Sequence, residues 1–125
     1  MLFDSDIIIW ALRGHGKAQA ILEEHERRTI SAVTYIEVVR GLKNKERLQA
    51  WKSLIKALEI DILPINEGIS TKAMYWSEEF SLSHGLELAD ALIAATADTH
   101  GLTLITGNIK DYQFLPSLSL KAFKE

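Results

Sequence analysis

Short apolar segments alternate with longer amphipathic segments along this chain of 125 residues. Apolar runs rich in β-type residues predict strands at residues 2–3, 29–31, 60–64, 102–106 and, as an edge strand, 118–120. Between them, apolar side chains recur every three or four residues, which predicts helices over residues 7–12, 17–28, 34–41, 44–58, 66–80 and 86–100, with a turn at 83–85. This alternation predicts a three-layer α/β/α fold with a mostly parallel central sheet of four to five strands.

The composition is that of one globular domain spanning residues 1–125. Hydrophobic residues make up 47% of the chain and charged residues 25%, which is ordinary for a soluble domain of this size. The absence of cysteine excludes disulfides and thiolate chemistry. The sequence shows no signal peptide and no apolar run long enough for a membrane span, so we expect a cytoplasmic protein that does not bind membranes.

A net charge of −3 argues weakly against nucleic acid as a partner. The basic residues are unevenly distributed, however, and six of the fourteen lie in one stretch: Arg40, Lys43, Lys45, Arg47, Lys52 and Lys56. Such a stretch can bind a phosphate backbone locally, and a solvated helix face explains it equally well.

Four acidic residues fall where predicted strands end or predicted helices begin: Asp4, Glu37, Asp90 and Asp111. Each has a structural explanation when taken alone. Asp4 can cap a helix, Glu37 can form a capping box with Thr34, Asp90 suits a helix N-terminus, and Asp111 suits a turn. Together they converge, because ligands bind at the carboxyl edge of a parallel sheet. Clustered carboxylates suit Mg²⁺ or Mn²⁺ and chemistry on phosphate groups.

Four segments resemble the sequence motifs of PIN-domain nucleases. They are Leu2–Asp6, Ser31–Gly41, Leu88–Ala97, and Leu104–Asn108 together with Asp111–Tyr112. Their order and spacing cover nearly the whole chain, and the length is similar to that of VapC-type toxins from bacterial and archaeal toxin–antitoxin pairs. One position departs from the pattern: Gly107 stands where many relatives carry a basic residue.

The resemblance implies an endoribonuclease that depends on Mg²⁺ or Mn²⁺. In that interpretation Asp4 and Asp90 are the main metal ligands, and Glu37 holds or orients the attacking water. Asp111 would support a second cation or the outer shell, a role that Asn108 or Asp6 could share.

Further expectations concern the substrate and partners. Thr106 and Asn108 would position ligands or substrate by hydrogen bonding, and Arg40 and Lys43 would contact RNA phosphates. The resemblance also implies an antitoxin protein whose segment blocks the carboxylates, and a homodimer. We expect the apolar stripes of residues 17–28 and 44–58 to serve these partners.

Two other functions compete with this interpretation. The Asp4-Ser5-Asp6 sequence after a strand is similar to the opening motif of haloacid-dehalogenase-type phosphatases, although Ile8 and the lack of a suitable lysine motif do not fit that family. A PIN-like binding module without catalysis is the second alternative, which the complete set of acids argues against.

Overall fold

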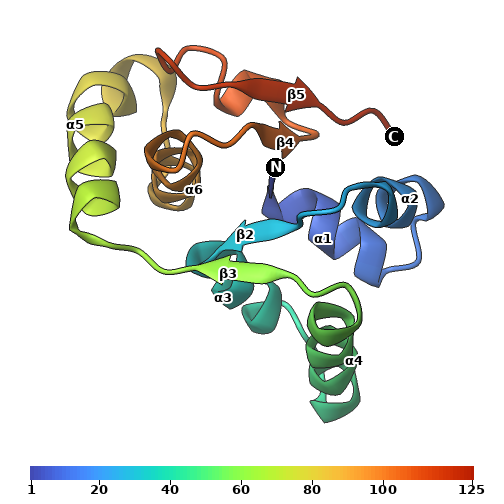
Figure 1. Ribbon diagram of the computed structural model, residues 1–125. Helices are drawn as coiled ribbons and strands as arrows, with labels where there is room; N and C mark the ends of the chain where they lie inside the picture. The colour runs from blue at the N-terminus through green and yellow to red at the C-terminus, as the bar shows by residue number, and fades with distance from the viewer.

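The computed structural model describes all 125 residues and contains one five-stranded, fully parallel sheet (Figure 1). The strand order is β3-β2-β1-β4-β5. The strands are short: Leu2–Phe3, Thr29–Ser31, Asp61–Leu63, Leu104–Thr106 and Leu120–Ala122 for β1 to β5. The predicted α/β/α fold is therefore confirmed, and even the edge strand β5 pairs parallel to its neighbour β4.

Six α-helices and one 3₁₀ helix connect the strands. The α-helices α1 to α6 are Ser5–Leu12, Gly16–Glu24, Ala32–Arg40, Lys45–Ala57, Glu67–His84 and Leu88–Thr99, and the 3₁₀ helix η1 is Ile109–Asp111. All six predicted helices exist, with ends that differ by a few residues.

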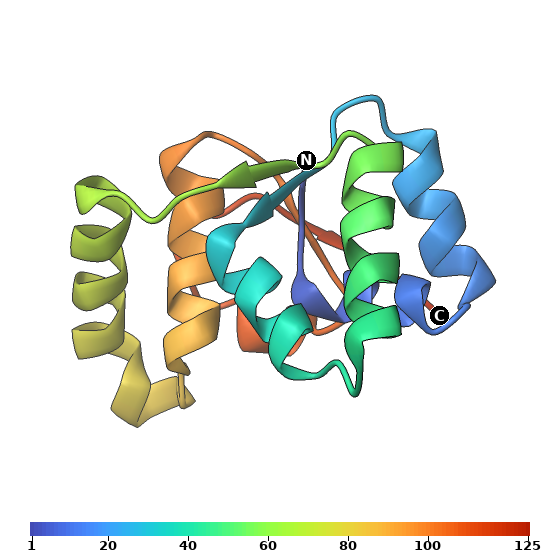
Figure 2. The same cartoon turned by 90° about the horizontal axis from the view of Figure 1, so that it is seen from below.

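Both faces of the sheet are buried, because successive side chains of a strand point to opposite faces. Leu2 and Leu104 pack with α5 and α6 in one core. Phe3 and Ile105, the next residues of β1 and β4, pack with α1, α2 and α4 in the other core. Figure 2 shows α5 and α6 on one side of the strands and α2 and α4 on the other.

Two predicted boundaries are wrong for identifiable reasons. Helix α2 ends at Glu24, not Arg28, and the Arg28 guanidinium donates hydrogen bonds to the carbonyls of Leu22, Glu23 and Leu58, where α2 and α4 end. Helix α5 continues to His84, beyond the predicted end at residue 80. Gly85 then ends it in a left-handed conformation with φ 66°, which glycine adopts without steric cost.

The centres of the apolar stripes of residues 17–28 and 44–58 pack in the core, which corrects the expectation that these stripes are free for partners. Ala18, Leu22 and Trp51, at the centre of these stripes, are buried against the sheet. The large apolar side chains that remain exposed lie elsewhere and include Ile36, Met74, Tyr75 and Leu88. None of the helices combines the length and the apolar character that crossing a membrane requires.

Candidate active site

The candidate site lies where the strand order reverses. Strand β1 is central, the chain continues from it to β2 and β3 on one side, and β4 and β5 lie on the other side. Ligands in open parallel sheets bind at this switch point, beyond the carboxyl ends of the strands. Asp4 immediately follows β1 and its N–H donates to the Ile105 carbonyl at 2.9 Å, so Asp4 lies beside Thr106, the last residue of β4.

Asp4 is held by three hydrogen bonds and is only 6% exposed. It caps α1, where its Oδ1 accepts from the Ser5 N–H at 2.8 Å. Its Oδ2 accepts from the Thr106 hydroxyl at 2.7 Å and from the Tyr112 hydroxyl at 3.0 Å. The carboxylate is thus fixed in orientation by groups from α1, from β4 and from the end of η1.

Asp90 enters the site from the first turn of α6. Its Oδ1 lies 3.1 Å from the Tyr112 hydroxyl, which therefore touches both Asp4 and Asp90. A phenol carries one hydrogen, so it can donate to only one of the two carboxylates at a time. The other carboxylate then needs a proton or a cation to offset its charge.

Glu37 reaches the site from α3 and does not form the capping box. Ser31, not Thr34, caps this helix, by accepting from the Val33 N–H at 3.0 Å. Glu37 Oε1 instead accepts from the Ser5 hydroxyl at 2.6 Å, and that hydroxyl also lies 3.0 Å from the hydroxyl of Thr34. The capping explanation for Glu37 is therefore wrong, and the side chain is tied to the residue next to Asp4.

Asp6 forms the rim of the site and connects α1 to the loop after β4. Its Oδ2 accepts from the Gly107 N–H at 2.9 Å and from the Asn108 side-chain amide at 3.3 Å. A Cβ atom at Gly107 would lie 2.8 Å from both Asp6 Oδ2 and the Trp10 ring. A side chain at this position would therefore require a shift of Asp6, of Trp10 or of the loop.

Asp111 is exposed and lies at the edge of the cluster. It shares a small polar hollow of about 90 Å³ with His84, Gly85, Glu87 and Asp90. Its carboxylate makes none of the side-chain hydrogen bonds that fix Asp4, Asp6 and Glu37.

Burial and mutual repulsion raise the pKa of the clustered acids. Burial is the main cause of the raised pKa of Asp4, and the nearby charge of Glu37 adds to it. Burial raises the pKa of Asp6 to about 6, and the Asp4 charge contributes. Burial, together with Asp4 and Asp111, raises the pKa of Asp90 to about 7, although the Tyr112 hydrogen bond opposes the shift. Burial and the two adjacent carboxylates also raise the pKa of Tyr112 far above its usual range.

Comparison with known proteins identifies the family. A family model described as PIN domain matches residues 1–113. The chain belongs to the PIN-domain family. It is 32% identical to Ribonuclease VapC10 of Mycobacterium tuberculosis over 94% of this chain and 90% of that protein. It is also similar to a toxin–antitoxin complex from Klebsiella pneumoniae, with a TM-score of 0.75, 32% identity, and coverage of 94% of this chain and 93% of that one.

A second solved structure extends the likeness of the fold. VapBC2 from Rickettsia felis, bound to a DNA fragment from its promoter, matches with a TM-score of 0.83 at 23% identity and covers 98% of each chain. The expected resemblance to PIN domains of the VapC type is therefore confirmed, and the haloacid-dehalogenase alternative is set aside.

The PIN-domain site has the charge that a divalent cation would neutralise. No lysine, arginine or histidine nitrogen lies within 4.0 Å of its carboxylates. The two ion pairs of the structure are elsewhere, at Lys72–Asp98 and His25–Glu24. No group of three acidic or histidine side chains is arranged to bind a metal ion without a change of conformation. The residues fit a hard cation by charge and by donor type, and Asp4 and Asp90 would close around it.

The structure brings together three of the four predicted acids, Asp4, Glu37 and Asp90, and places Asp111 at the rim. Thr106 is completely buried and donates to Asp4, so of its two expected roles only the positioning of a ligand fits. Asn108 is exposed and donates to Asp6, while its N–H donates to the Thr106 hydroxyl at 3.0 Å.

The two predicted phosphate contacts lie outside the carboxylate cluster. Arg40 is exposed at the end of α3, one turn beyond Glu37. Lys43 lies in a groove of about 510 Å³ that it shares with Arg13 and Arg47. The groove also includes Ile9, one turn beyond Ser5 on α1.

Three polar residues of the site were not predicted to belong to it: Tyr112, Ser5 and Thr34. Ser5 and Tyr112 each adjoin a predicted acid in sequence, which is the signal that could have found them. Thr34 was assigned to a helix cap, and its position inside α3 became visible only in the fold.

Proposed function

We propose that this protein is a VapC-type ribonuclease that hydrolyses RNA phosphodiester bonds with Mg²⁺ or Mn²⁺ and acts as the toxin of a toxin–antitoxin pair in the cytoplasm. One observation carries the proposal: three carboxylates from separate segments, the buried Asp4, the half-buried Asp90 and the exposed Glu37, meet at the sheet's switch point with no cationic side chain to neutralise them. The VapC ribonucleases that resemble this chain over nearly its full length support the same function.

The residues divide the work by position. Asp4 and Asp90 would hold the cation, which supplies positive charge beside the scissile phosphate and favours ionisation of a water. Glu37 is exposed enough to reach that water and is oriented by Ser5. Thr106 keeps the Asp4 carboxylate in place, and Asp111 faces the outer hollow beside Asp90, where it would assist a second cation or its water shell.

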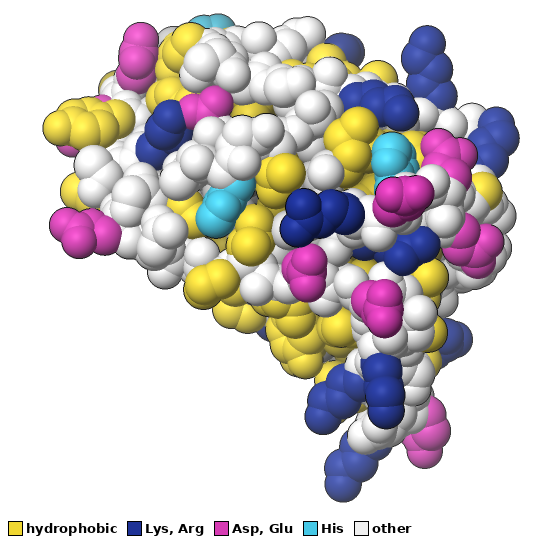
Figure 3. Space-filling model, viewed as in Figure 1, with side chains coloured by type: hydrophobic (Ala, Val, Ile, Leu, Met, Phe, Trp, Pro, Cys, Tyr) yellow, Lys and Arg dark blue, Asp and Glu magenta, His cyan; other side chains and the backbone are white.

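RNA would approach across the basic surface next to the site. Arg40 and Lys43 lie at the end of α3 and just after it, and the basic residues of α4 continue this surface. Figure 3 shows Lys and Arg side chains projecting from the region of α4 at the lower right of the molecule. Removing exposed phosphate contacts of this kind would weaken the binding of all RNA sequences to a similar extent. Such contacts would also make RNA binding sensitive to salt.

Cleavage of RNA by the purified protein tests the enzymatic proposal. We expect cleavage in Mn²⁺, none in EDTA, and a loss greater than about 100-fold for Asp4→Asn, since even outer-shell partners commonly contribute 10–100-fold. Lys110→Gln, an exposed change beside the site that leaves the acids intact, is the matched control. A folded Asp4→Asn protein with wild-type cleavage would refute the site, and cleavage that persists in EDTA would refute the cofactor.

The antitoxin would insert a segment into the groove that contains Lys43. Apolar residues such as Ile9, Leu12 and Leu42 alternate there with the bases Arg13 and Arg47, so the groove suits a segment with apolar and acidic side chains. Because the groove begins one turn from Ser5 and Glu37, a bound segment would also block access to the carboxylates.

Co-purification with the product of the neighbouring gene tests this contact. Leu42→Glu places a negative charge on the groove and should abolish co-purification, whereas Ala57→Glu at the far end of α4 should leave it unchanged. Equal recovery of the neighbouring protein with both variants would contradict this placement of the antitoxin.

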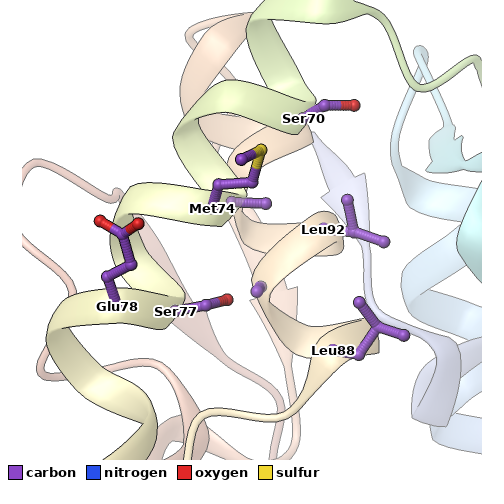
Figure 4. Close-up of a pocket in the computed structure, with 8 residues that line it drawn as sticks. Ser70, Met74, Ser77, Glu78, Leu88 and Leu92 are labelled. Atoms are coloured by element: carbon purple, nitrogen blue, oxygen red, sulfur yellow. The ribbon is translucent and has the colours of Figure 1, made fainter.

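A homodimer would cover the apolar groove between α5 and α6. Met74 on α5 and Leu88 and Leu92 on α6 line this groove (Figure 4). Met74 is 65% exposed and Leu88 is 77% exposed, which is unusual for apolar side chains that adjoin one another.

Light scattering after size exclusion tests the dimer. We expect twice the chain mass for wild type and for Ala57→Glu, and the single-chain mass for Leu88→Glu. A monomeric wild type at high concentration would refute the dimer.

A further inference from the structure

Tyr112 is a buried polar residue whose role the sequence does not reveal. Its side chain is completely inaccessible to solvent and belongs to the same core as Leu2, Leu104 and the buried residues of α5 and α6. Its hydroxyl is the one part of the side chain with polar partners, and it lies 3.0 Å from Asp4 Oδ2 and 3.1 Å from Asp90 Oδ1.

A buried hydroxyl between two carboxylates has no packing justification. Phenylalanine would fill the same space, and burying a polar group is favourable only when it is hydrogen-bonded. Asp4 has two other donors, Ser5 and Thr106, but Tyr112 is the protein group that donates to the Asp90 side chain. The hydroxyl therefore matters most for Asp90, which it links to the more firmly fixed Asp4.

The geometry sets the separation of the two acids. Because both oxygens contact the same hydroxyl, they lie no more than about 6 Å apart. Two oxygens that bind opposite sides of one Mg²⁺ are about 4 Å apart, given ligand distances of about 2.1 Å. The shared hydroxyl therefore keeps the two oxygens within about 6 Å, a limit that includes the separation a shared cation requires.

We propose that Tyr112 is a positioning residue that holds Asp4 and Asp90 as a pair, so that the cation meets preorganised ligands. This inference rests on the proposed function, in which these two carboxylates bind the metal. Tyr112 does not touch the RNA, because it is buried; it acts only through the orientation of the acids.

Tyr112→Phe tests the proposal, since it removes one oxygen and retains the ring. Tyr35→Phe is the matched control, because Tyr35 packs against Trp51 on another part of the protein and makes no hydrogen bond through its hydroxyl to these acids. Mn²⁺ binding is measured by calorimetry on the full chain. We expect the Kd of Tyr112→Phe to rise about tenfold or more, as for loss of outer-shell partners, and that of Tyr35→Phe to remain within twofold of wild type.

A second measurement needs no metal. Thermal melts in EDTA of wild type, Tyr112→Phe, Asp90→Asn and the double variant form a double-mutant cycle. A positioning role predicts that Tyr112→Phe lowers Tm by several degrees more when Asp90 is intact than in the Asp90→Asn background, because an ionised acceptor loses more than a neutral one. A residue that only packs in the core predicts equal losses in both backgrounds.

The outcomes separate the two proposals. Unchanged Mn²⁺ affinity in Tyr112→Phe, with wild type binding Mn²⁺, would overturn the role of Tyr112 and leave the metal site intact. A wild type that binds no Mn²⁺ would overturn the proposed cofactor instead. The cycle in EDTA then still decides whether Tyr112 holds Asp90, with additive losses counting against it and a clear coupling in favour of it.

Discussion

Replacing Asp90 by asparagine should stabilise the protein when metal is absent, although it should abolish RNA cleavage. Asparagine keeps the shape of the side chain and a carbonyl oxygen that can still accept the Tyr112 hydrogen bond. What disappears is a negative charge that burial, Asp4 and Asp111 all disfavour. The Asp90 carboxylate would thus lower the stability of the metal-free protein while serving as a metal ligand.

The magnitude follows from the pKa of Asp90, which is about 7 against an ordinary value of 3.8. The full shift corresponds to about 4 kcal/mol at ~1.4 kcal/mol per pKa unit. Because the carboxylate is partly exposed, solvent screening reduces this to about 1–2 kcal/mol. Loss of a favourable charge in the first turn of α6 removes roughly 0.5 kcal/mol. A net gain of about 1 kcal/mol remains, or about 3–5 °C in Tm for a domain of this size.

The pH dependence gives the effect a sign that can be checked. The pKa of Asp90 is raised in the folded state, so the unfolded state releases its proton first. The stability that the protonated acid provides is complete below about pH 4 and is lost as the pH rises towards 7. Melts in EDTA should therefore show the smallest advantage of Asp90→Asn near pH 4 and the largest at pH 8.

Asp98→Asn is the matched control, because Asp98 lies on the same helix but pairs with Lys72. Neutralising this acid breaks an ion pair, so it should lower Tm in EDTA at pH 8. Excess Mn²⁺ should raise the Tm of wild type and of Asp98→Asn more than that of Asp90→Asn, since a ligand that binds only the folded state stabilises it. If Asp90→Asn melts below wild type in EDTA at pH 8, the cost of the buried and repelled Asp90 charge is not the dominant effect.

Three further changes test other parts of the site. Glu37→Gln should reduce cleavage at least about 100-fold and leave Tm unchanged, as measured by a cleavage assay paired with a thermal melt. If the Glu37→Gln protein cleaves as fast as wild type, Glu37 has no catalytic role. Ser5→Ala removes the donor to Glu37 and should slow cleavage about tenfold, measured as kcat; an effect on Tm alone would assign Ser5 to structure. Gly107→Ala should lower the free energy of unfolding by about 1–3 kcal/mol in denaturant, because its Cβ would overlap Asp6 and Trp10, whereas Gly41→Ala meets only ordinary contacts and should change it little.

The fold was predictable because its signals are local. Apolar runs and helical periodicity indicated all five strands and all six helices, and alternation of the two indicated the parallel sheet. One helix end was mispredicted where a long-range contact is involved. Arg28 was assigned to a helix that stops four residues earlier, and the contacts that its guanidinium makes with the carbonyl of Leu58 could not be read from neighbouring residues.

The site was predictable only in part, for a related reason. The acids carry their signal in position, since residues that follow parallel strands meet at one edge of the sheet. Of the groups that orient those acids, only Thr106 was predicted, and the others carry the weaker signal of lying next to an acid in sequence or within a motif. Tyr112 looks like a core aromatic in the sequence, and only the packing of η1 against the sheet brings its hydroxyl between Asp4 and Asp90. Likewise Thr34 and Glu37 fit a capping box in the sequence. In the structure Ser31 caps the helix instead, and the side chains of Thr34 and Glu37 both contact the Ser5 hydroxyl. The ligands of such a site follow from the topology, and their orientation follows from the packed core.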